Sequence, residues 1–378
     1  MRFRLPATGR GSGSGSGPIA AGMLLGAALD ALVGDPRRCH PVAAYGRAVG
    51  AVERRMHNDG RAAGVAFTAV CAGAPVLAGV ALQRATRGRP IARTALTAVA
   101  TWAVLGGTTL RREAAAMGGA LDRGDLAAAR ARLPHLAGRD PSVLDAAGLA
   151  RATVESVAEN TSDAVVAPLV WGALGGVPGL LGYRAVNTLD AMVGHRSPRY
   201  RRFGWASARL DDAVNLVPAR FTAALTVAAA PVVGGSRRES WRVWRRDGRA
   251  HPSPNSGHCE ASAAGALGVR LGGRNVYAGR TEDRPGLGDG PPPSIVDVGR
   301  AARLSRAVAA GALVLTVGHV AARPLRRRLY AAVGDRLGHR SGGAAVRSPG
   351  GAAVRSLGNA AARSAGRAVA RPARGAAR

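Results

Sequence analysis

The sequence predicts an all-α, multi-pass integral membrane protein with polar loops and a disordered C-terminal tail rich in Arg, Ala and Gly. Several long apolar runs carry no charged residue and are flanked by arginine. Stretches that alternate β-branched and polar residues, which would indicate strands, are sparse between these runs. The chain has 378 residues and is 47% hydrophobic, which is enough material for a core. Helices of membrane length therefore explain the pattern better than a sheet does.

The two ends of the chain have compositions that do not build a core. Residues 1–17 finish in GSGSGSG, a flexible linker composition, and we expect this leader to be disordered. Residues 338–378 consist mainly of Ala, Gly, Ser and Arg and contain no acidic residue. We expect this basic tail to be disordered as well, with at most loose contacts to anionic lipid or nucleic acid. The helical membrane domain is therefore expected over residues 18–337.

The apolar runs differ in how well they fit a bilayer. Residues 62–83 are long enough to cross it and lie between Arg61 and Arg84. Residues 19–33 are too short for a clear span. Much of the apolar material is Ala and Gly, which insert only weakly, so buried helices of a soluble protein are the alternative. The recurrence of arginine at the ends of the runs favours insertion. The other uncharged runs are residues 94–110, 164–183, 221–236 and 307–322.

Glycine and proline interrupt one of these runs. The sequence GGVPG occupies residues 175–179, within the run 164–183. Because Gly and Pro break a helix, we expect a re-entrant hairpin there, which keeps the polar segments before and after the run on one side of the membrane. The arginines do not fix the orientation, since every segment between the runs is basic.

The composition excludes several functions. All 53 basic residues are arginine, so the net charge of +30 comes without a lysine for a P-loop or a Schiff base. Aromatic residues make up only 4% of the chain, too few for a platform that stacks single-stranded nucleic acid. A basic nucleic-acid-binding protein would explain the charge but not the apolar runs, so we expect no specific nucleic-acid partner. Three cysteines at unrelated spacings indicate a reduced, cytosol-facing location rather than a disulfide framework.

A group of carboxylates stands directly before the run 164–183. Glu155, Glu159 and Asp163 are spaced by four residues, which places them on one face of a helix with Asn160 beside them. Like charges stacked in this way repel each other, so such a face suggests a bound Mg²⁺ or an anchored cationic group. The alternative is a solvated helix on which Arg151 is the partner.

The next polar segment, after the same run, interleaves acids and arginines at helical spacing. Asp190, Asp211 and Asp212 are candidate ligands of a divalent ion. Arg184 and Arg209 suit phosphates or carboxylates, and Asn187 adds an amide beside them. A network of salt bridges in a loop would give the same pattern.

The last polar segment, residues 245–273, is shaped by Pro and Gly and enters a helix near Glu260. His251 and Asn255 are candidates to line a pocket, and the helix entry offers backbone N–H groups to an anion. The spacing of His and Cys does not match structural zinc. From Gly272 onward we expect an irregular segment. Near the N-terminus, a Gly-Asp-Pro turn and a His-Pro step make Asp35 and His40 candidates for either a functional or a purely structural role.

Five segments together resemble the CobD/CbiB family, the membrane-bound cobinamide or cobinamide-phosphate synthases of cobalamin biosynthesis. The resemblance runs from about residue 19 to 322 and leaves out the leader and the tail. In order, the segments read GDPRRCHPV, ESVAENTSDAVVAPL, YRAVNTLDAMVGH, RYRRFGWASARLDDAVNLVPAR and HPSPNSGHCEASAAGALGVRLGG.

The resemblance implies an acid–amine ligase of the inner membrane whose active site faces the cytosol. Such an enzyme uses ATP and Mg²⁺ to join (R)-1-aminopropan-2-ol or its O-phosphate to the f-side-chain carboxylate of adenosylcobyric acid. Membrane lipid and other enzymes of the corrinoid pathway are the implied partners. The rival interpretation is a corrinoid-binding or transport protein without catalysis.

The implied chemistry assigns roles to the candidate residues. Glu155, Glu159 and Asp163 would bind Mg²⁺ or the substrate ammonium, with Asp211 and Asp212 as alternative metal ligands. Arg184 and Arg209 would contact phosphates. His251 and Asn255 would line the corrinoid or nucleotide pocket, and we add Asn160 and Asn187 to the residues expected to contact the nucleotide.

Overall fold

The computed structural model describes residues 15–35, 41–195, 197–277 and 280–341. The predictions for the leader and the tail therefore lie almost entirely outside the described residues, as does His40. The chain divides into two compact units, Met1–Pro324 and Leu325–Arg378. The account below concerns the first unit, which contains every candidate site residue.

The described chain is mainly helical, as the sequence predicts. The α-helices are α1 (Ser16–Leu32), α2 (Pro41–Met56), α3 (Arg61–Ala85), α4 (Pro90–Val104), α5 (Gly107–Asp122), α6 (Leu126–Arg132), α7 (Ala146–Thr161), α8 (Ala167–Gly175), α9 (Val177–Val193), α10 (Trp205–Ala229), α11 (Arg237–Asp247), α12 (Ser256–Leu267) and α13 (Ile295–Ser341). Single turns of other helical types are η1 (Leu133–His135), η2 (Ser162–Val166) and η3 (Ala230–Val233). Two strands, β1 (Leu271–Tyr277) and β2 (Arg280–Leu287), pair antiparallel.

Three of the described helices are long and apolar enough to cross a membrane, which supports a membrane protein. They are α3, α10 extended to Val233, and α13 as far as Arg326. The predicted run 62–83 falls inside α3. The run 94–110 is not one helix, however, because α4 ends at Val104 and α5 begins at Gly107. In the break, the Gly106 N–H donates to the Ala164 carbonyl (3.1 Å), so a tertiary contact replaces the helical hydrogen bond.

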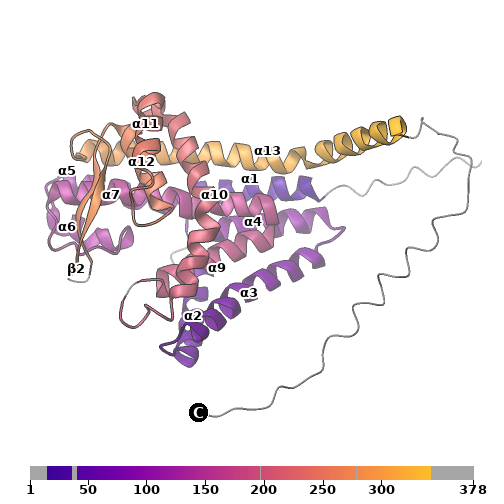
Figure 1. Cartoon of the computed structure of the whole chain (residues 1–378), viewed down its shortest axis with the longest axis horizontal. Helices are drawn as coiled ribbons and strands as arrows, with labels where there is room; N and C mark the ends of the chain where they lie inside the picture. The colour runs from indigo at the N-terminus through magenta and orange to yellow at the C-terminus, as the bar shows by residue number, and fades with distance from the viewer. Residues whose placement is uncertain (1–14, 36–40, 196, 278–279, 342–378) are drawn as a thin grey trace, which may run out of the picture. The chain divides into compact units, whose positions relative to one another are not determined.

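The predicted break in the run 164–183 is confirmed. Helices α8 and α9 pack against each other and meet at Gly176, whose φ of 66° favours glycine. The turn is held by the end of α3, where Gln83 Oε1 accepts from the Val177 N–H (3.1 Å). Helix α9 then packs along α3, and α4 packs on α1. In Figure 1, α1, α3 and α4 extend to one side of α10, while α5, α6, α7 and the strands lie on the other.

The β-hairpin was not predicted, and the segment from Gly272 was expected to be irregular. Gly272 and Gly273 both have positive φ, at 84° and 89°, where β1 carries a bulge. The pairing depends on contacts from elsewhere in the chain: Arg151 donates to the carbonyls of Gly272 and Arg274. Local sequence therefore contains little of the signal that makes this segment a strand.

Helices α7 and α12 run through the largest hydrophobic core. Every residue of α12 is buried, and most of them are Ala, Gly or Ser. Small side chains let neighbouring helices approach closely, and α12 packs against α7, α10 and α11. This packing carries the polar N-terminal end of α12 into the middle of the protein.

Candidate functional site

Four carboxylates from four elements come close enough to interact electrostatically. Glu159 lies on α7, Asp163 on η2, Asp190 on α9 and Asp211 on α10. We call these four residues the acid cluster. Burial raises the pKa of Asp163 well above its usual value, and the charges of Asp211, Glu159 and Asp190 raise it further. The Arg184 guanidinium acts in the opposite direction on the pKa of Asp163. The cluster is thus short of positive charge.

Asp190 shows the same electrostatic imbalance. Burial, followed by the charge of Asp212, raises the pKa of Asp190 to about 6, although His195 partly opposes this. A carboxyl with this pKa remains ionised at pH 7 but takes up a proton in mild acid. A divalent ion or an ammonium group at the cluster would stabilise the ionised form.

The π-turn η2 decides where Asp163 points. Residues 162–166 form one wide helical turn between α7 and α8, and such turns are frequent at functional sites. Glu155 and Glu159 lie one turn apart on α7, and Asp163 follows them as the second residue of the π-turn. Asp163 interacts with Asp190 and Asp211, whereas Glu155 interacts with Glu260, and the charge of Glu159 acts on both Asp163 and Glu260.

In the described part of the chain, hydrogen bonds engage only one of the two carboxylate oxygens of Asp211. Asn215 Nδ2 donates to Asp211 Oδ2 (2.9 Å), and the Tyr183 hydroxyl donates to Asn215 Oδ1 (2.9 Å). Asp211 Oδ1 is buried and accepts no hydrogen bond from the described residues. Beside it, Arg184 Nη1 approaches Asn187 Oδ1 at 3.4 Å. Asp35 lies close enough to interact electrostatically with Arg184, so the N-terminal polar segment reaches the site as well.

A second polar group lies next to the cluster, under the β-hairpin. Glu155 is 1% exposed and pairs through Oε2 with Arg139 Nη1 (2.5 Å), whose side chain is 6% exposed. Glu155 Oε1 accepts from the Gly272 N–H (2.6 Å). Both oxygens of Glu155 are thus engaged in holding the loop before α7 and the hairpin, which points to a structural role.

Glu260 and His251 complete this second group. Glu260 is 1% exposed, and neither of its oxygens has a hydrogen-bond partner among the described residues. Burial, then the charges of Glu155 and Glu159, raises the pKa of Glu260 well above its usual value. His251 Nδ1 accepts from the Ser253 N–H (3.0 Å), so Nε2 carries the proton and faces Glu260 Oε1 at 3.7 Å. Burial, followed by Arg284, lowers the pKa of His251 to about 4, so the ring is neutral at pH 7.

The loop before α12 joins the two groups. Ser256 Oγ donates to Glu159 Oε1 (2.6 Å), and Asn255 Nδ2 donates to the carbonyl of Asp212 (2.8 Å). Three polar segments that are far apart in the sequence are therefore brought together by direct hydrogen bonds. The convergence expected from the re-entrant hairpin is observed.

Two of the predicted residues lie away from the acid cluster. Asn160 folds back on its own helix, where Nδ2 donates to the Ser156 carbonyl (2.9 Å). Arg209 is 69% exposed and lies 3.8 Å from Asp212 Oδ2. Sequence reasoning did not select Asn215, Arg139 or Glu260 as site residues, whereas Asp190 was among the aspartates considered for a divalent ion. Of the three residues that were not selected, only Glu260 could have been noticed from the sequence, because it is an acid next to apolar helical sequence.

The carboxylates of the acid cluster could bind a metal ion only together with other ligands. Among the described residues, no three His, Cys, Asp or Glu side chains form a group that could hold a metal ion alone. Mg²⁺ is usually held by one or two carboxylates together with substrate phosphates and water, so it does not need such a group. The buried, unpartnered Asp211 Oδ1 and the raised pKa of Asp163 fit a cation that arrives with a substrate.

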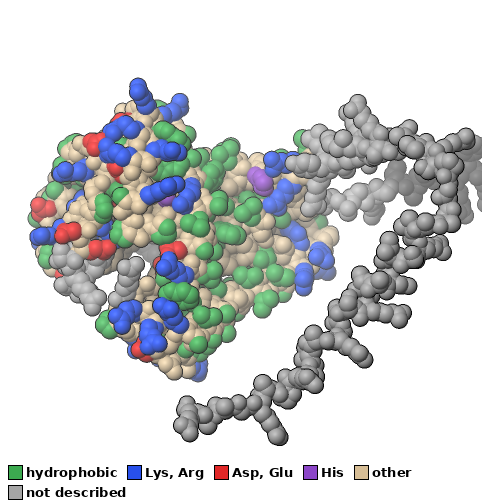
Figure 2. Space-filling view, viewed as in Figure 1, with side chains coloured by type: hydrophobic (Ala, Val, Ile, Leu, Met, Phe, Trp, Pro, Cys, Tyr) green, Lys and Arg blue, Asp and Glu red, His purple; other side chains and the backbone are tan. Residues whose placement is uncertain are grey.

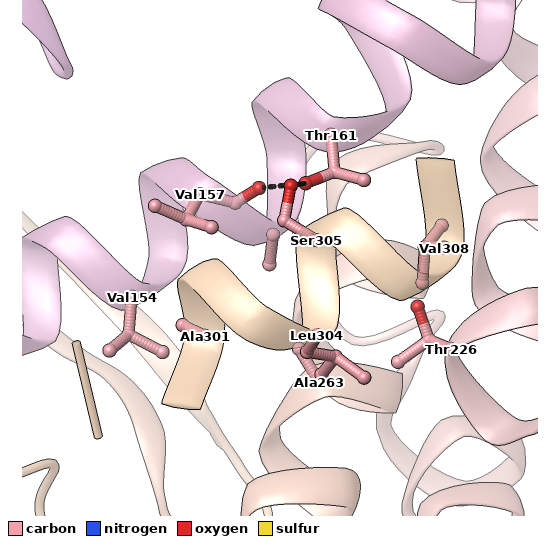
Figure 3. A pocket seen from close by; sticks show the side chains of 10 residues that line it. Val154, Val157, Thr161, Thr226, Ala263, Ala301, Leu304, Ser305 and Val308 are labelled. Atoms are coloured by element: carbon pink, nitrogen blue, oxygen red, sulfur yellow. Dashed lines mark hydrogen bonds between the residues drawn. The ribbon is translucent and has the colours of Figure 1, made fainter. Parts of the chain in front are cut away.

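A small apolar cavity lies close to the end of α7 and is not the site. Its volume is about 20 Å³, room for a water molecule but not for a substrate. Figure 3 shows Val154, Val157 and Thr161 on one side of it, with Leu304 and Ser305 of α13 opposite. The Thr161 hydroxyl hydrogen-bonds Ser305 Oγ (2.7 Å), which ties α7 to α13 behind the acid cluster.

Comparison with known proteins adds to this geometry. The family model described as CobD/Cbib protein matches residues 23–305, a range that includes every element of the site. A protein named Cobalamin biosynthesis protein CobD from Mycobacterium tuberculosis is 56% identical over 299 residues, 79% of this chain and 95% of the relative. Proteins of the same name from Geobacter metallireducens and Rhodobacter capsulatus are 47% and 41% identical over 268 and 313 residues, covering 69% and 80% of this chain and 84% and 98% of the relatives. No solved structure matches the chain significantly.

Proposed function

The chain belongs to the CobD/CbiB protein family, and we propose that its step in cobalamin biosynthesis is the ATP-dependent formation of an amide. The acid is the f-side-chain carboxylate of adenosylcobyric acid, and the amine is (R)-1-aminopropan-2-ol or its O-phosphate. The products are adenosylcobinamide or its phosphate, ADP and inorganic phosphate. The protein would lie in the plasma membrane with this site toward the cytosol, where ATP is present.

The acid cluster is the observation that supports this function best. Amide ligation of this kind brings two cationic groups to an enzyme, the Mg²⁺ that accompanies ATP and the ammonium of the amine. Glu159, Asp163, Asp190 and Asp211 together hold more negative charge than Arg184 offsets, as the raised pKa values of Asp163 and Asp190 indicate. A site with this imbalance favours binding of either cation.

Within this proposal, Asp211 would hold the Mg²⁺ through its unpartnered Oδ1, together with Asp163, whose charge interacts with that of Asp211. When bound, Mg²⁺ would offset the phosphate charge of ATP and make the terminal phosphoryl group a better acceptor for the substrate carboxylate. Arg184 lies beside these carboxylates and would contact the phosphates, and the exposed Arg209 would meet them at the rim. Asp212, which accepts from Asn255 through its backbone, stands close enough to Asp190 to support the same ion.

The amine must lose a proton before it attacks the activated carboxyl group. Glu159 is suited to accept that proton, since Ser256 Oγ already fixes one of its oxygens at 2.6 Å and the residue lies beside Asp163. His251 is neutral and directs its Nε2–H toward Glu260, so it orients buried carboxyl groups rather than acting as a base at pH 7. The bond that forms joins the amine nitrogen to the acyl carbon, and phosphate leaves.

Membranes that contain the chain provide the direct test. They would be incubated with adenosylcobyric acid, ATP and Mg²⁺, and with each amine in a separate reaction, and the corrinoid products would be measured by mass spectrometry. We expect the mass of the amide with one of the two amines, and no product without ATP or from membranes that lack the chain. A corrinoid that is bound by the membranes but never converted with either amine would refute the ligase and favour a binding or transport protein.

A further inference from the structure

The surface of α3 divides cleanly into a buried face and an apolar exposed face. Between Arg61 and Arg84, every exposed position of α3 carries Ala, Val or Leu. The helix is 25 residues long, about 37 Å at 1.5 Å per residue, which exceeds the hydrocarbon thickness of a bilayer. The exposed residues are Ala62, Val65, Ala66, Ala69, Val70, Ala74, Leu77, Ala78, Ala81 and Leu82.

Neighbouring helices share this apolar exposure and end at the same level as α3. On α1 the large exposed residues are leucines, and on α4 they are Ile91 and Val99. Arg93 at the start of α4 donates to the Gln83 carbonyl near the end of α3, and Gln83 also caps the turn between α8 and α9. Arg323 of α13 donates to the carbonyl of Ala173, at the end of α8. The ends of α3 and α8 and the start of α4 therefore lie at one level of the helix bundle. Arginines gather at this level, as expected at a membrane boundary.

Helix α10 has the length of a span but a different exposed face. Its exposed positions repeat at helical spacing and mix Leu210, Leu216 and Val217 with Arg209 and Arg220. Arg220 stands near the middle of the stretch from Trp205 to Val233, with Nη1 directed to the Leu216 carbonyl. An arginine at the centre of a span and facing lipid costs about 2.5 to 3.5 kcal/mol on insertion scales.

A mixed face of this kind suits a helix that lies in the membrane interface. There, leucine and valine reach the acyl chains while arginine side chains bend toward the phosphate headgroups. Trp205 at the start of α10 is 40% exposed and lies against Arg61, an aromatic and basic pair typical of the interface. Figure 1 shows α10 running across the common direction of α1, α4 and the first part of α13.

We propose that α10 lies in the plane of the membrane surface, with its exposed face against lipid. The apolar turn between α8 and α9 and helices α1, α3, α4 and residues 307–322 of α13 form the part that enters the bilayer. The buried face of α10 carries Asp211 and Asn215, so this placement keeps the acid cluster at the level of the headgroups. The site would then be reached from water along the membrane surface.

Lipid is a better occupant of this face than a second copy of the chain. Helix α10 packs against α3, whose exposed face is apolar, and in Figure 2 hydrophobic side chains are numerous across the middle of the molecule, interspersed with other side chains. The face carries positive charge at Arg220 and at Arg209, which is 69% exposed and lies 3.8 Å from Asp212 Oδ2, and positive charge matches anionic phosphates. Two copies that met through this face would bring their arginines together.

Depth measurements with single labels test the proposal. Cys39 would be replaced by serine, whereas Cys71 and Cys259 are buried and can remain. A fluorophore on Leu210→Cys, Val217→Cys or Ala224→Cys would be quenched by lipids that carry a quencher at a shallow or a deep position, in nanodiscs with the full chain. Val65→Cys, Val70→Cys and Leu77→Cys on α3 serve as matched controls on a helix that crosses the bilayer.

The two arrangements give different depth profiles. From residue 210 to 224 a helix advances about 21 Å, so a spanning α10 would change depth by most of that distance. We expect instead that all three α10 labels are quenched most by the shallow quencher and lie within about 5 Å of one depth, while the three α3 labels change depth steadily. A steady change along α10 would overturn the proposal. Labels that no lipid quenches and that transfer energy between copies would overturn it in favour of self-association.

Discussion

Replacement of Glu155 by glutamine should destabilise the fold much more than it impairs the chemistry. Glu155 is buried and binds the equally buried Arg139 at 2.5 Å, so the variant leaves a guanidinium in the interior without its counter-charge. Removing one partner of a buried pair costs about 3 to 5 kcal/mol. The glutamine oxygen can still accept from the Gly272 N–H, so the variant keeps this hydrogen bond while it removes the charge that pairs with Arg139 and repels Glu260. Glu155→Ala also leaves that N–H unpaired and should cost roughly 1 to 3 kcal/mol more.

Unfolding by sodium dodecyl sulfate in mixed micelles, followed by circular dichroism, measures both effects. The double variant Glu155→Gln with Arg139→Met provides the control, because removing both charges of a buried pair is often nearly neutral. We expect Glu155→Gln to unfold at a lower detergent fraction and the double variant to recover most of the loss. If Glu155→Gln kept the stability of the parent but lost amide formation, Glu155 would act chemically and the assignment to the ion pair would be wrong.

Three further predictions address single contacts. Since burial and neighbouring like charges raise the pKa of Asp163 and raise that of Asp190 to about 6, protons compete with the metal, and Mn²⁺ binding in the presence of a non-hydrolysable ATP analogue should weaken as the pH falls toward 6 and below; Asp190→Asn should make this dependence shallower in an electron paramagnetic resonance titration, and an unchanged dependence would contradict the role of Asp190. Ser256→Ala should lower the rate of amide formation by about fivefold, since a hydrogen bond worth about 1 kcal/mol no longer positions Glu159, whereas an unchanged rate would exclude this role of Ser256. Gly176→Ala should lower the free energy of unfolding by about 1 to 3 kcal/mol. The φ of 66° and ψ of −143° at this position suit only glycine, and an added Cβ would lie 2.3 Å from Gln83 Oε1. Equal stability of variant and parent in the detergent titration would contradict this prediction.

The sequence predicted those parts of the fold that follow from local pattern. The apolar run 62–83 and its flanking arginines correspond to one helix, and GGVPG does break a run at Gly176. The run 94–110 was predicted wrongly because its break at Gly106 is stabilised by the carbonyl of Ala164, far away in the chain. The β-hairpin escaped prediction for the same reason, since Arg151 and Glu155 hold its glycine-containing strand.

The site was predictable where residues of one helix share a chemical type. Glu159, Asp163 and Asp211 were selected by spacing and by their position beside apolar helices, and the structure brings them together. Spacing alone could not reveal that Glu155 belongs to Arg139 or that Asn160 folds back on Ser156. Both facts depend on which side chains the tertiary fold brings into contact.

Glu260 shows which kind of site residue sequence reasoning misses. In the sequence it is one acid in an alanine-rich helix, which indicates burial but not which residues surround it. Its importance becomes visible only when burial, the approach of His251 at 3.7 Å and the charges of Glu155 and Glu159 are known. Glu155 and Glu159 lie about 100 positions before Glu260 in the chain, and no local pattern encodes their approach.

Amide formation by the purified chain in nanodiscs, with Glu159→Gln and Asp163→Asn as variants, tests the central claim most directly. Both substitutions preserve size and remove a negative charge from a buried group of like charges, so both variants should fold and insert as the parent does. If the acid cluster holds the cations of the ligation and accepts the proton of the amine, each variant should lose roughly 100-fold or more in the rate of amide formation. Full activity in both variants would contradict the account.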